Sequence, residues 1–244
     1  SRGLGDVYKR QALPKLKTLT YELELPSTQV HIWRGIVDIS SLHLQPYWEI
    51  ISPDEKQRAK RFKVRLHQYR FTVTRGILRN ILASYLSIPP QQITFGLGSY
   101  GKPFIQRPLG HNLRFNITHS QGLALYALSR DYEVGIDIER SRSNLNYQPI
   151  AERILNVSEK NQLYALPASQ QQKAFLTCWT RKEAFVKACG KGLAFPLRDL
   201  SVTFSPNQTP RILTVKGGPP GSKQWSLYNL SLSSQYLAAL VVAG

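Results

Sequence analysis

The chain is most informative where residues 179–193 read WTRKEAFVKACGKGL. Apolar side chains recur around this stretch at an approximate helical spacing, at Phe175, Leu176, Trp179, Phe185 and Val186. The pattern predicts a long helix over about residues 169–189, which the glycines and the proline of residues 190–196 end. Glu183 and Lys187 then share a face of the helix. Because an acid four residues before a lysine also stabilises an ordinary exposed helix, the spacing alone leaves a purely structural interpretation open.

The second informative stretch is VGIDIER, at residues 134–140. Valine and isoleucine alternate with Gly135, Asp137 and Glu139, which predicts a strand with one apolar face over residues 134–139. Both carboxylates then point the same way, and such a pair suits a hard cation such as Mg²⁺. A half-solvated strand without any site would show the same alternation.

Together the two stretches supply three carboxylates and two lysines that could hold one divalent metal ion and a diphosphate, namely Asp137, Glu139, Glu183, Lys182 and Lys187. Transfer of a phosphoryl group to a hydroxyl depends mainly on positioning and on neutralisation of charge. A metal ion that bridges a diphosphate also orients the leaving group. The residue types therefore suit an enzyme of phosphoryl transfer.

Three motifs follow one another in the order FNITHS (residues 115–120), VGIDIE (134–139) and WTRKEAFVKACGKGL (179–193). This series resembles the signature of the 4′-phosphopantetheinyl transferases of the Sfp type, the long single-chain form. Two more stretches, SPDEKQRAKRF (52–62) and YGKPFI (100–105), are similar to the coenzyme-binding segments of that family. The resemblance implies an enzyme that transfers the 4′-phosphopantetheine arm of coenzyme A to a serine of an apo acyl or peptidyl carrier protein and releases adenosine 3′,5′-bisphosphate.

The resemblance implies roles for the residues of the second and third motifs. Asp137, Glu139 and Glu183 would bind the metal ion, normally Mg²⁺ with Mn²⁺ as the alternative, together with the diphosphate. Glu183 would also be the general base, while Lys187 would assist the leaving group and Lys182 would contact the same phosphates. The charge of the metal opposes any rise in the pKa of a nearby acid, so either Glu183 or a metal-bound water or hydroxyl could take the serine proton.

The resemblance also implies a set of coenzyme-binding residues, which are Arg58, Arg61, Gly101, Lys102, Pro103, Thr118, His119, Lys182 and Lys187. The arginines would bind phosphates, Thr118 and His119 would contact the nucleotide end, and residues 101–103 would line the adenine. A single histidine after a strand is also common as a hydrogen-bonded structural residue, so His119 has a second interpretation.

The order of the expected elements and the resemblance together predict an α+β fold made of two similar α+β halves in one pseudo-twofold chain, with the active cleft between the halves. The resemblance also implies a monomer. Residues 1–12 are expected to be a non-native or disordered leader. Residues 13–130 would form the coenzyme-gripping half, and residues 131–244 would carry the metal and the base. The first half is expected to contain helices at 54–62 and 67–86 and strands at 29–39, 92–95, 102–105, 113–118 and 123–128. The second is expected to contain a strand at 134–139, helices at 150–155, 158–166 and 169–189, and further strands to the end.

The net charge of +17 indicates an acidic partner. Nine basic residues fall within residues 53–79, against the two acids Asp54 and Glu55. Such a run is usually a solvated helix face. Arg58 and Arg61 could also bind the phosphates of the coenzyme, and the other seven basic residues could attract an acidic carrier protein.

The remaining composition decides less. The 42% of hydrophobic residues indicates a globular chain. Cys178 and Cys189 show neither a disulfide framework nor a zinc spacing, and no apolar run is long enough to span a membrane. The sequence therefore predicts a cytoplasmic protein without a membrane segment.

Three other classes compete with the transferase. A nucleic-acid-binding module would use the basic residues 53–79, but no RNA- or DNA-binding motif accompanies them. A P-loop enzyme would need five-residue glycine spacing and a serine or threonine after the lysine, which residues 190–193 lack. A family member that has lost catalysis remains in reserve, although every motif position is filled.

Overall fold

The structure is a computed structural model that describes residues 8–11, 23–142, 145–216 and 224–243. The chain divides into two compact units. Unit 1 comprises the residues up to Leu97, Pro103–Phe115 and His119–Asp131, and unit 2 comprises Gly98–Lys102, Asn116–Thr118 and the residues from Tyr132 onward. The predicted halves differ from this division, because residues 98–102 and 116–118 belong to the second unit although they precede residue 131.

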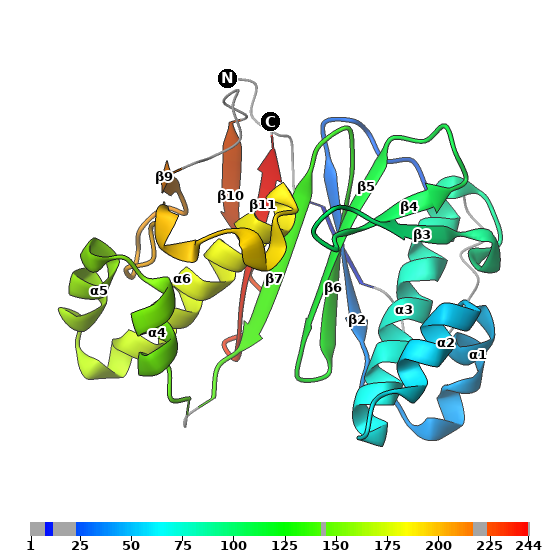
Figure 1. Cartoon of the computed structure of the whole chain (residues 1–244), viewed down its shortest axis with the longest axis horizontal. Coiled ribbons are helices and arrows are strands. Elements are labelled where there is room, and N and C mark those ends of the chain that lie inside the picture. The colour runs from blue at the N-terminus through cyan, green and yellow to red at the C-terminus, as the bar shows by residue number, and fades with distance from the viewer. Residues whose placement is uncertain (1–7, 12–22, 143–144, 217–223, 244) are drawn as a thin grey trace. The chain divides into compact units, whose positions relative to one another are not determined.

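A four-stranded sheet, which belongs to unit 1 except for residues 116–118, has the order β1 (Tyr8–Gln11), β2 (Val30–Ile36), β6 (Leu123–Arg130) and β5 (Leu113–Ser120). A separate hairpin is formed by β3 (Thr94–Leu97) and β4 (Pro103–Arg107). The helices are α1 (Gln45–Ile50), α2 (Pro53–Lys60) and α3 (Arg65–Leu86) (Figure 1). Ile77 of α3 and Tyr126 of β6 both approach Gly35 of β2, which places α3 against this sheet.

Strand β1 corrects one expectation. Residues 8–11 pair in parallel with β2, with Tyr8 opposite His31 and Gln11 opposite Arg34. This part of the predicted leader is therefore a sheet strand and not disordered. Residues 1–7 and 12, the rest of that predicted leader, lie outside the described residues.

Unit 2 contains a three-stranded antiparallel sheet in the order β10 (Trp225–Asn229), β11 (Tyr236–Ala243) and β7 (Val134–Arg140). The long helix α6 (Ala168–Cys189) packs across β7 and β11 (Figure 1). The other helices are α4 (Gln148–Ile154) and α5 (Val157–Tyr164), and β8 (Leu200–Val202) pairs with β9 (Ile212–Val215). Helix α6 ends at Gly190, whose φ of 71° is a left-handed conformation that glycine adopts without a Cβ clash.

The α+β class is confirmed, and helices and strands lie close to their predicted positions. Both units contain a 22-residue helix, α3 in the first and α6 in the second. Aromatic rings fill the core beneath α6, where Phe185 lies 5.5 Å from Phe195 and 5.0 Å from Trp225 between ring centroids. The predicted pseudo-twofold relation and the cleft between the halves stay predictions.

Candidate functional site

The site in unit 2 begins with the close approach of β7 to α6. A Cβ atom at Gly135 would lie 2.0 Å from the Ala184 carbonyl oxygen and 2.3 Å from the Ala188 nitrogen. Only a glycine leaves room for the helix backbone here. Helix α6 therefore covers the face of β7 at Gly135 and Asp137, while Glu139 farther along the same face is half-buried.

Asp137 is the most deeply buried carboxylate of this face, with 5% of its surface exposed. Its Oδ1 accepts hydrogen bonds from Lys187 Nζ at 2.6 Å and from Thr118 Oγ1 at 3.1 Å. Its Oδ2 is buried and has no hydrogen-bond partner among the described residues. Burial raises the pKa of Asp137 above its ordinary value, although Lys187 and Thr118 act in the opposite direction.

Glu183 lies on α6, and the negative charges of Asp137 and Glu139 on β7 act on its carboxyl group. Burial raises the pKa of Glu183, repulsion by Asp137 and Glu139 raises it further, and Lys187 lowers it. Helix α6 packs on β7, with Glu183 and Lys187 on the helix and Asp137 and Glu139 on the strand. The grouping of the three acids around one metal ion stays a prediction.

The three acidic side chains do not surround one common position for a metal ion. In the described part of the chain, no three acid, histidine or cysteine side chains are placed so that they could hold a metal ion together. The donor set nevertheless fits a hard cation, because it offers only carboxylate oxygens and one of them, Asp137 Oδ2, is buried with no hydrogen-bond partner among the residues that the structure describes.

Lys182 lies elsewhere, which corrects the prediction that it contacts the phosphates. Its side chain is fully buried, and Nζ donates to Glu159 Oε2 at 2.6 Å, to the Leu197 carbonyl at 2.9 Å and to the Ile154 carbonyl at 3.2 Å. A lysine has three donors, so none remains for a phosphate. Sequence spacing could not reveal this partner, because Glu159 is on another helix.

The loop of residues 100–103 is anchored through the lysine that we predicted beside the adenine. Lys102 Nζ donates to Glu133 Oε2 at 2.6 Å, to the Ala188 carbonyl at 2.9 Å and to the Val134 carbonyl at 3.3 Å. Gly101 has a φ of 83°, and Pro103 begins β4. The side chain of Lys102 therefore holds the loop to unit 2, while the adenine-lining role of residues 101–103 stays a prediction.

Strand β5 supplies two residues that support this site. Asn116 Oδ1 accepts a hydrogen bond from the backbone nitrogen of Ile136 at 2.9 Å, and Thr118 contacts both Asp137 and Lys187. We predicted that Thr118 contacts the nucleotide, but in the structure its buried hydroxyl donates a hydrogen bond to the Asp137 carboxylate. Asn116 was missed, although its position two residues before Thr118 places both on one face of a strand. His119, the next residue, is exposed.

The basic stretch of unit 1 separates into two groups. Arg58 and Arg61 are exposed and line a hollow of about 640 Å³ with Asp54, Gln57 and Phe62. An open, positively charged hollow can accept a phosphate. Arg75 and Arg79 instead bind the buried Glu55, with Arg79 Nε 2.7 Å from Glu55 Oε2. The expectation that these two arginines belong to a solvated, steering face is therefore wrong.

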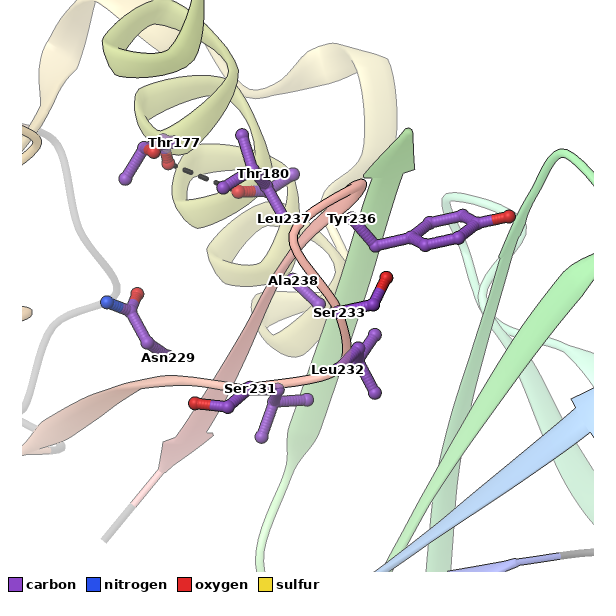
Figure 2. Close-up of a pocket in the computed structure, with 10 residues that line it drawn as sticks. Thr177, Thr180, Asn229, Ser231, Leu232, Ser233, Tyr236, Leu237 and Ala238 are labelled. Carbon is purple, nitrogen blue, oxygen red and sulfur yellow. Dashed lines mark hydrogen bonds between the residues drawn. The ribbon is translucent and has the colours of Figure 1, made fainter. Parts of the chain in front are cut away.

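Sequence reasoning missed a groove of about 330 Å³ in unit 2. Figure 2 shows it between α6 and the segment that leads into β11. Thr180 on its wall precedes Glu183 by three residues, so the two are neighbours on the helix surface. Leu237 on the opposite wall pairs directly with Glu139. The wall is uncharged, and it consists of Thr177, Thr180, Asn229, Leu230, Ser231, Leu232, Ser233, Tyr236, Leu237 and Ala238.

The chain is similar to known proteins along most of its length. Residues 133–241 match the model of the 4′-phosphopantetheinyl transferase superfamily, and residues 40–130 match the model of the N-terminal region of 4′-phosphopantetheinyl transferases. The chain is 38% identical to the 4′-phosphopantetheinyl transferase HetI of Nostoc sp. over 95% of this chain and 93% of that protein. It is 30% identical to the 4′-phosphopantetheinyl transferase Sfp of Bacillus subtilis over 64% of this chain and 67% of that protein.

Among solved structures, a holo-(acyl-carrier-protein) synthase of Bacillus anthracis in complex with CoA (3′,5′-ADP) covers 46% of this chain and 94% of its own. The TM-score is 0.38 and the sequence identity is 27%. Within the described residues, no helix is both long and apolar enough to cross a bilayer.

Proposed function

The chain belongs to the 4′-phosphopantetheinyl transferase superfamily, and from this premise we propose that it moves the phosphopantetheine arm of coenzyme A onto a serine of an acidic carrier protein with the help of Mg²⁺. The observation that carries the proposal is the 2.6 Å contact between Lys187 Nζ of α6 and Oδ1 of the buried Asp137 of β7, with Glu183 and Glu139 on the same two elements. These are the acids and the lysine that phosphoryl transfer needs.

The metal would be held by the carboxylates of Asp137, Glu139 and Glu183. When bound, Mg²⁺ withdraws charge from the diphosphate and so eases attack at phosphorus. Asp137 has the strongest claim as a ligand, because its Oδ2 is buried and unpartnered among the described residues. Mn²⁺ would suit the same oxygen donors.

Glu183 is the group that we assign as general base. The serine hydroxyl attacks the phosphorus that carries the pantetheine arm, and its proton passes to a Glu183 carboxylate oxygen. A bond from serine oxygen to phosphorus forms, while the bond from that phosphorus to the bridging oxygen breaks. Burial raises the pKa of Glu183, with added repulsion from Asp137, which makes its carboxylate a better base than an exposed one.

Lys187 neutralises the charge that develops on the bridging oxygen, so that adenosine 3′,5′-bisphosphate leaves. Its side chain is 29% exposed, which lets the ammonium reach a ligand without unfolding its surroundings. Arg58, Arg61 and His119 are proposed to bind the phosphates and nucleotide of the coenzyme, and Gly101, Lys102 and Pro103 to line the adenine. The exposed arginines support this assignment.

The partner would be attracted by charge. With a net charge of +17, the chain should attract an acidic carrier by long-range steering. We expect added salt to slow modification at subsaturating carrier, because salt screens such steering. The monomeric state and the cytoplasmic location stay predictions.

The direct test is the mass of the carrier. Purified protein, coenzyme A, Mg²⁺ and an apo acyl carrier protein are incubated, and the carrier is weighed by mass spectrometry. We expect the mass to rise by one phosphopantetheine group, and the Glu183→Gln protein to give no rise while its circular dichroism stays that of the folded chain. A carrier of unchanged mass, tested also with an apo peptidyl carrier protein, would contradict the proposal.

A further inference from the structure

We infer that Lys187 is the built-in counter-ion of Asp137: its ammonium compensates the carboxylate while the site holds no metal, and leaves it for the diphosphate when a metal ion binds. The inference rests on the proposed function, because it requires both the metal and the diphosphate. It adds a second task to Lys187, which couples metal binding to coenzyme binding.

The geometry of Lys187 carries the first step. Its Nζ is 2.6 Å from Asp137 Oδ1 but 3.2 Å from Thr118 Oγ1 and 3.4 Å from the Ile136 carbonyl. The short contact is the charged one, so Asp137 is the main partner. The Asp137 side chain is 7% exposed and that of Lys187 is 29% exposed. A flexible, partly exposed lysine can leave this pair, whereas Asp137 is fixed in the strand.

Asp137 is a carboxylate that requires a cation. It is buried, and a buried carboxylate without a nearby positive charge is strongly unfavourable. Lys187 compensates only Oδ1, whereas Oδ2 has no hydrogen-bond partner in the described part of the chain. A divalent ion that binds Asp137 would sit a few ångströms from the ammonium and repel it. The two cations therefore compete for one carboxylate.

Two other lysines of unit 2 have different partners. Lys102 is held by Glu133, and Lys182 is held by Glu159. Each also donates to two backbone carbonyls, so each is fixed at its own position. Lys187 differs because its partner is itself a proposed metal ligand.

A coupling between ligands follows. The diphosphate offers the displaced ammonium a new anionic partner, so the cost of removing Lys187 from Asp137 is smaller when coenzyme A is present. Coenzyme A should then raise the affinity for the metal, and the metal should raise the affinity for coenzyme A by the same factor. The free protein would bind the metal weakly, and the two ligands would enter together.

The test measures Mn²⁺ binding at pH 8 by the electron paramagnetic resonance signal of the free ion, with and without coenzyme A. Without coenzyme A, Lys187→Met should bind Mn²⁺ about tenfold more tightly than the wild type, because a competing charge is gone. Coenzyme A should raise the Mn²⁺ affinity of the wild type and raise it less in the variant. Lys173→Met, which removes an exposed lysine of the same helix, should behave as the wild type.

Thermal unfolding gives a second readout. In EDTA, Lys187→Met should melt at a lower temperature than the wild type, and saturating Mn²⁺ should recover most of the difference, while Lys187→Arg should resemble the wild type in both measurements. Equal or weaker Mn²⁺ binding by Lys187→Met would overturn the counter-ion inference and leave the transferase site intact. Failure of every protein to bind Mn²⁺, even with coenzyme A, would overturn the proposed metal site as well.

Discussion

Lys182 Nζ lies 2.6 Å from Glu159 Oε2, and both side chains are buried within unit 2. The same carboxylate group accepts hydrogen bonds from the backbone nitrogens of Asn156 and Val202. The pair thus ties α5 and the segment around β8 to the turn of α6 that carries Glu183. Lys182 and Glu183 are adjacent in the sequence but face different surroundings, since one supports the helix and the other belongs to the site.

Lys182→Met should destabilise the fold, because it leaves the Glu159 charge buried without its cation. We expect a loss of about 3 to 5 kcal/mol in the free energy of unfolding. Urea denaturation at pH 7 measures this loss, and the double variant Lys182→Met with Glu159→Gln should recover part of it. An unaltered stability, combined with a raised KM for coenzyme A, would instead favour direct phosphate binding by Lys182.

Glu183→Gln should abolish most of the turnover without unfolding the chain. General base catalysis contributes roughly 10² to 10⁴ in rate, and the amide removes both the base and one metal ligand. Burial raises the pKa of Glu183, and repulsion by Asp137 raises it further. The ionised carboxylate therefore lowers the free energy of unfolding at pH 7. We therefore expect the free energy of unfolding to be unchanged or higher. A turnover within a factor of two of the wild type would remove Glu183 as the base.

Gly135→Ala should push β7 away from α6. The new Cβ would meet the Ala184 carbonyl oxygen at 2.0 Å, and a backbone atom cannot rotate away. Overpacking typically costs about 1 to 3 kcal/mol, and we expect the upper end here together with weaker Mn²⁺ binding. Gly98→Ala is the matched control, because its Cβ would lie 3.5 Å from the Lys102 carbonyl oxygen, an ordinary contact. Equal stability of the two variants would contradict the close packing.

Glu55→Gln tests the buried arginine cluster of unit 1. Burial acts to raise the pKa of Glu55, but Arg75 and Arg79 outweigh it and hold the pKa below its ordinary value of 4.5. A carboxyl with a lowered folded pKa stabilises fully above the unfolded value, and this stability is lost as the pH falls through the lower folded value. We expect Glu55→Gln to lose about 3 kcal/mol at pH 7.

Urea unfolding between pH 7 and pH 3 checks both the loss and its pH dependence. The wild type should lose stability below about pH 4.5 more steeply than Glu55→Gln, which lacks the titrating group. Asp54→Asn changes the neighbouring exposed acid and should match the wild type. Parallel pH profiles for wild type and Glu55→Gln would show that the cluster does not stabilise the fold through its charge.

Ser233→Trp tests the groove of unit 2, which Thr180 of α6 and Leu237 of β11 also line. Ser233 lines the groove and is exposed, so a large side chain there should narrow the groove without disturbing the core (Figure 2). We expect kcat/KM to fall by about tenfold, because misplacement of a substrate near the reacting atoms is costly. Ser234→Trp, an exposed neighbour, is the control. A raised KM for coenzyme A would indicate that the groove holds the pantetheine arm of the coenzyme. A raised KM for the carrier would indicate that the groove contacts the carrier protein, and unchanged kinetics would exclude both roles.

Local signals in the sequence predicted much of unit 2. The apolar spacing around Trp179 placed the long helix within one residue of the observed Ala168–Cys189, and Gly190 ended it as expected. The alternation of residues 134–139 predicted β7 and put Asp137 and Glu139 on one face. These features depend on neighbours in the sequence, which is why pattern and spacing were sufficient.

Features that depend on distant partners were not predictable in this way. Nothing near Lys182 in the sequence shows that Glu159 would take its charge, and the run of basic residues gives no sign that Arg75 and Arg79 turn inward. The groove depends on the register of β11 against β7, which side-chain periodicity does not fix. Strand β1 was not predicted, because residues 1–12 were expected to be a non-native or disordered leader, although backbone pairing with β2 makes little demand on their side chains.

Because residues 98–102 and 116–118 belong to unit 2, this unit cannot be produced whole as one continuous fragment that starts after residue 131. A fragment that starts at residue 132 would contain the whole stretch matched by the superfamily model, yet it would lack Lys102, Asn116 and Thr118. The Ala188 carbonyl, the Ile136 amide and the Asp137 carboxylate would each lose a hydrogen bond. We therefore expect a fragment that starts at residue 132 to be less stable than the whole chain.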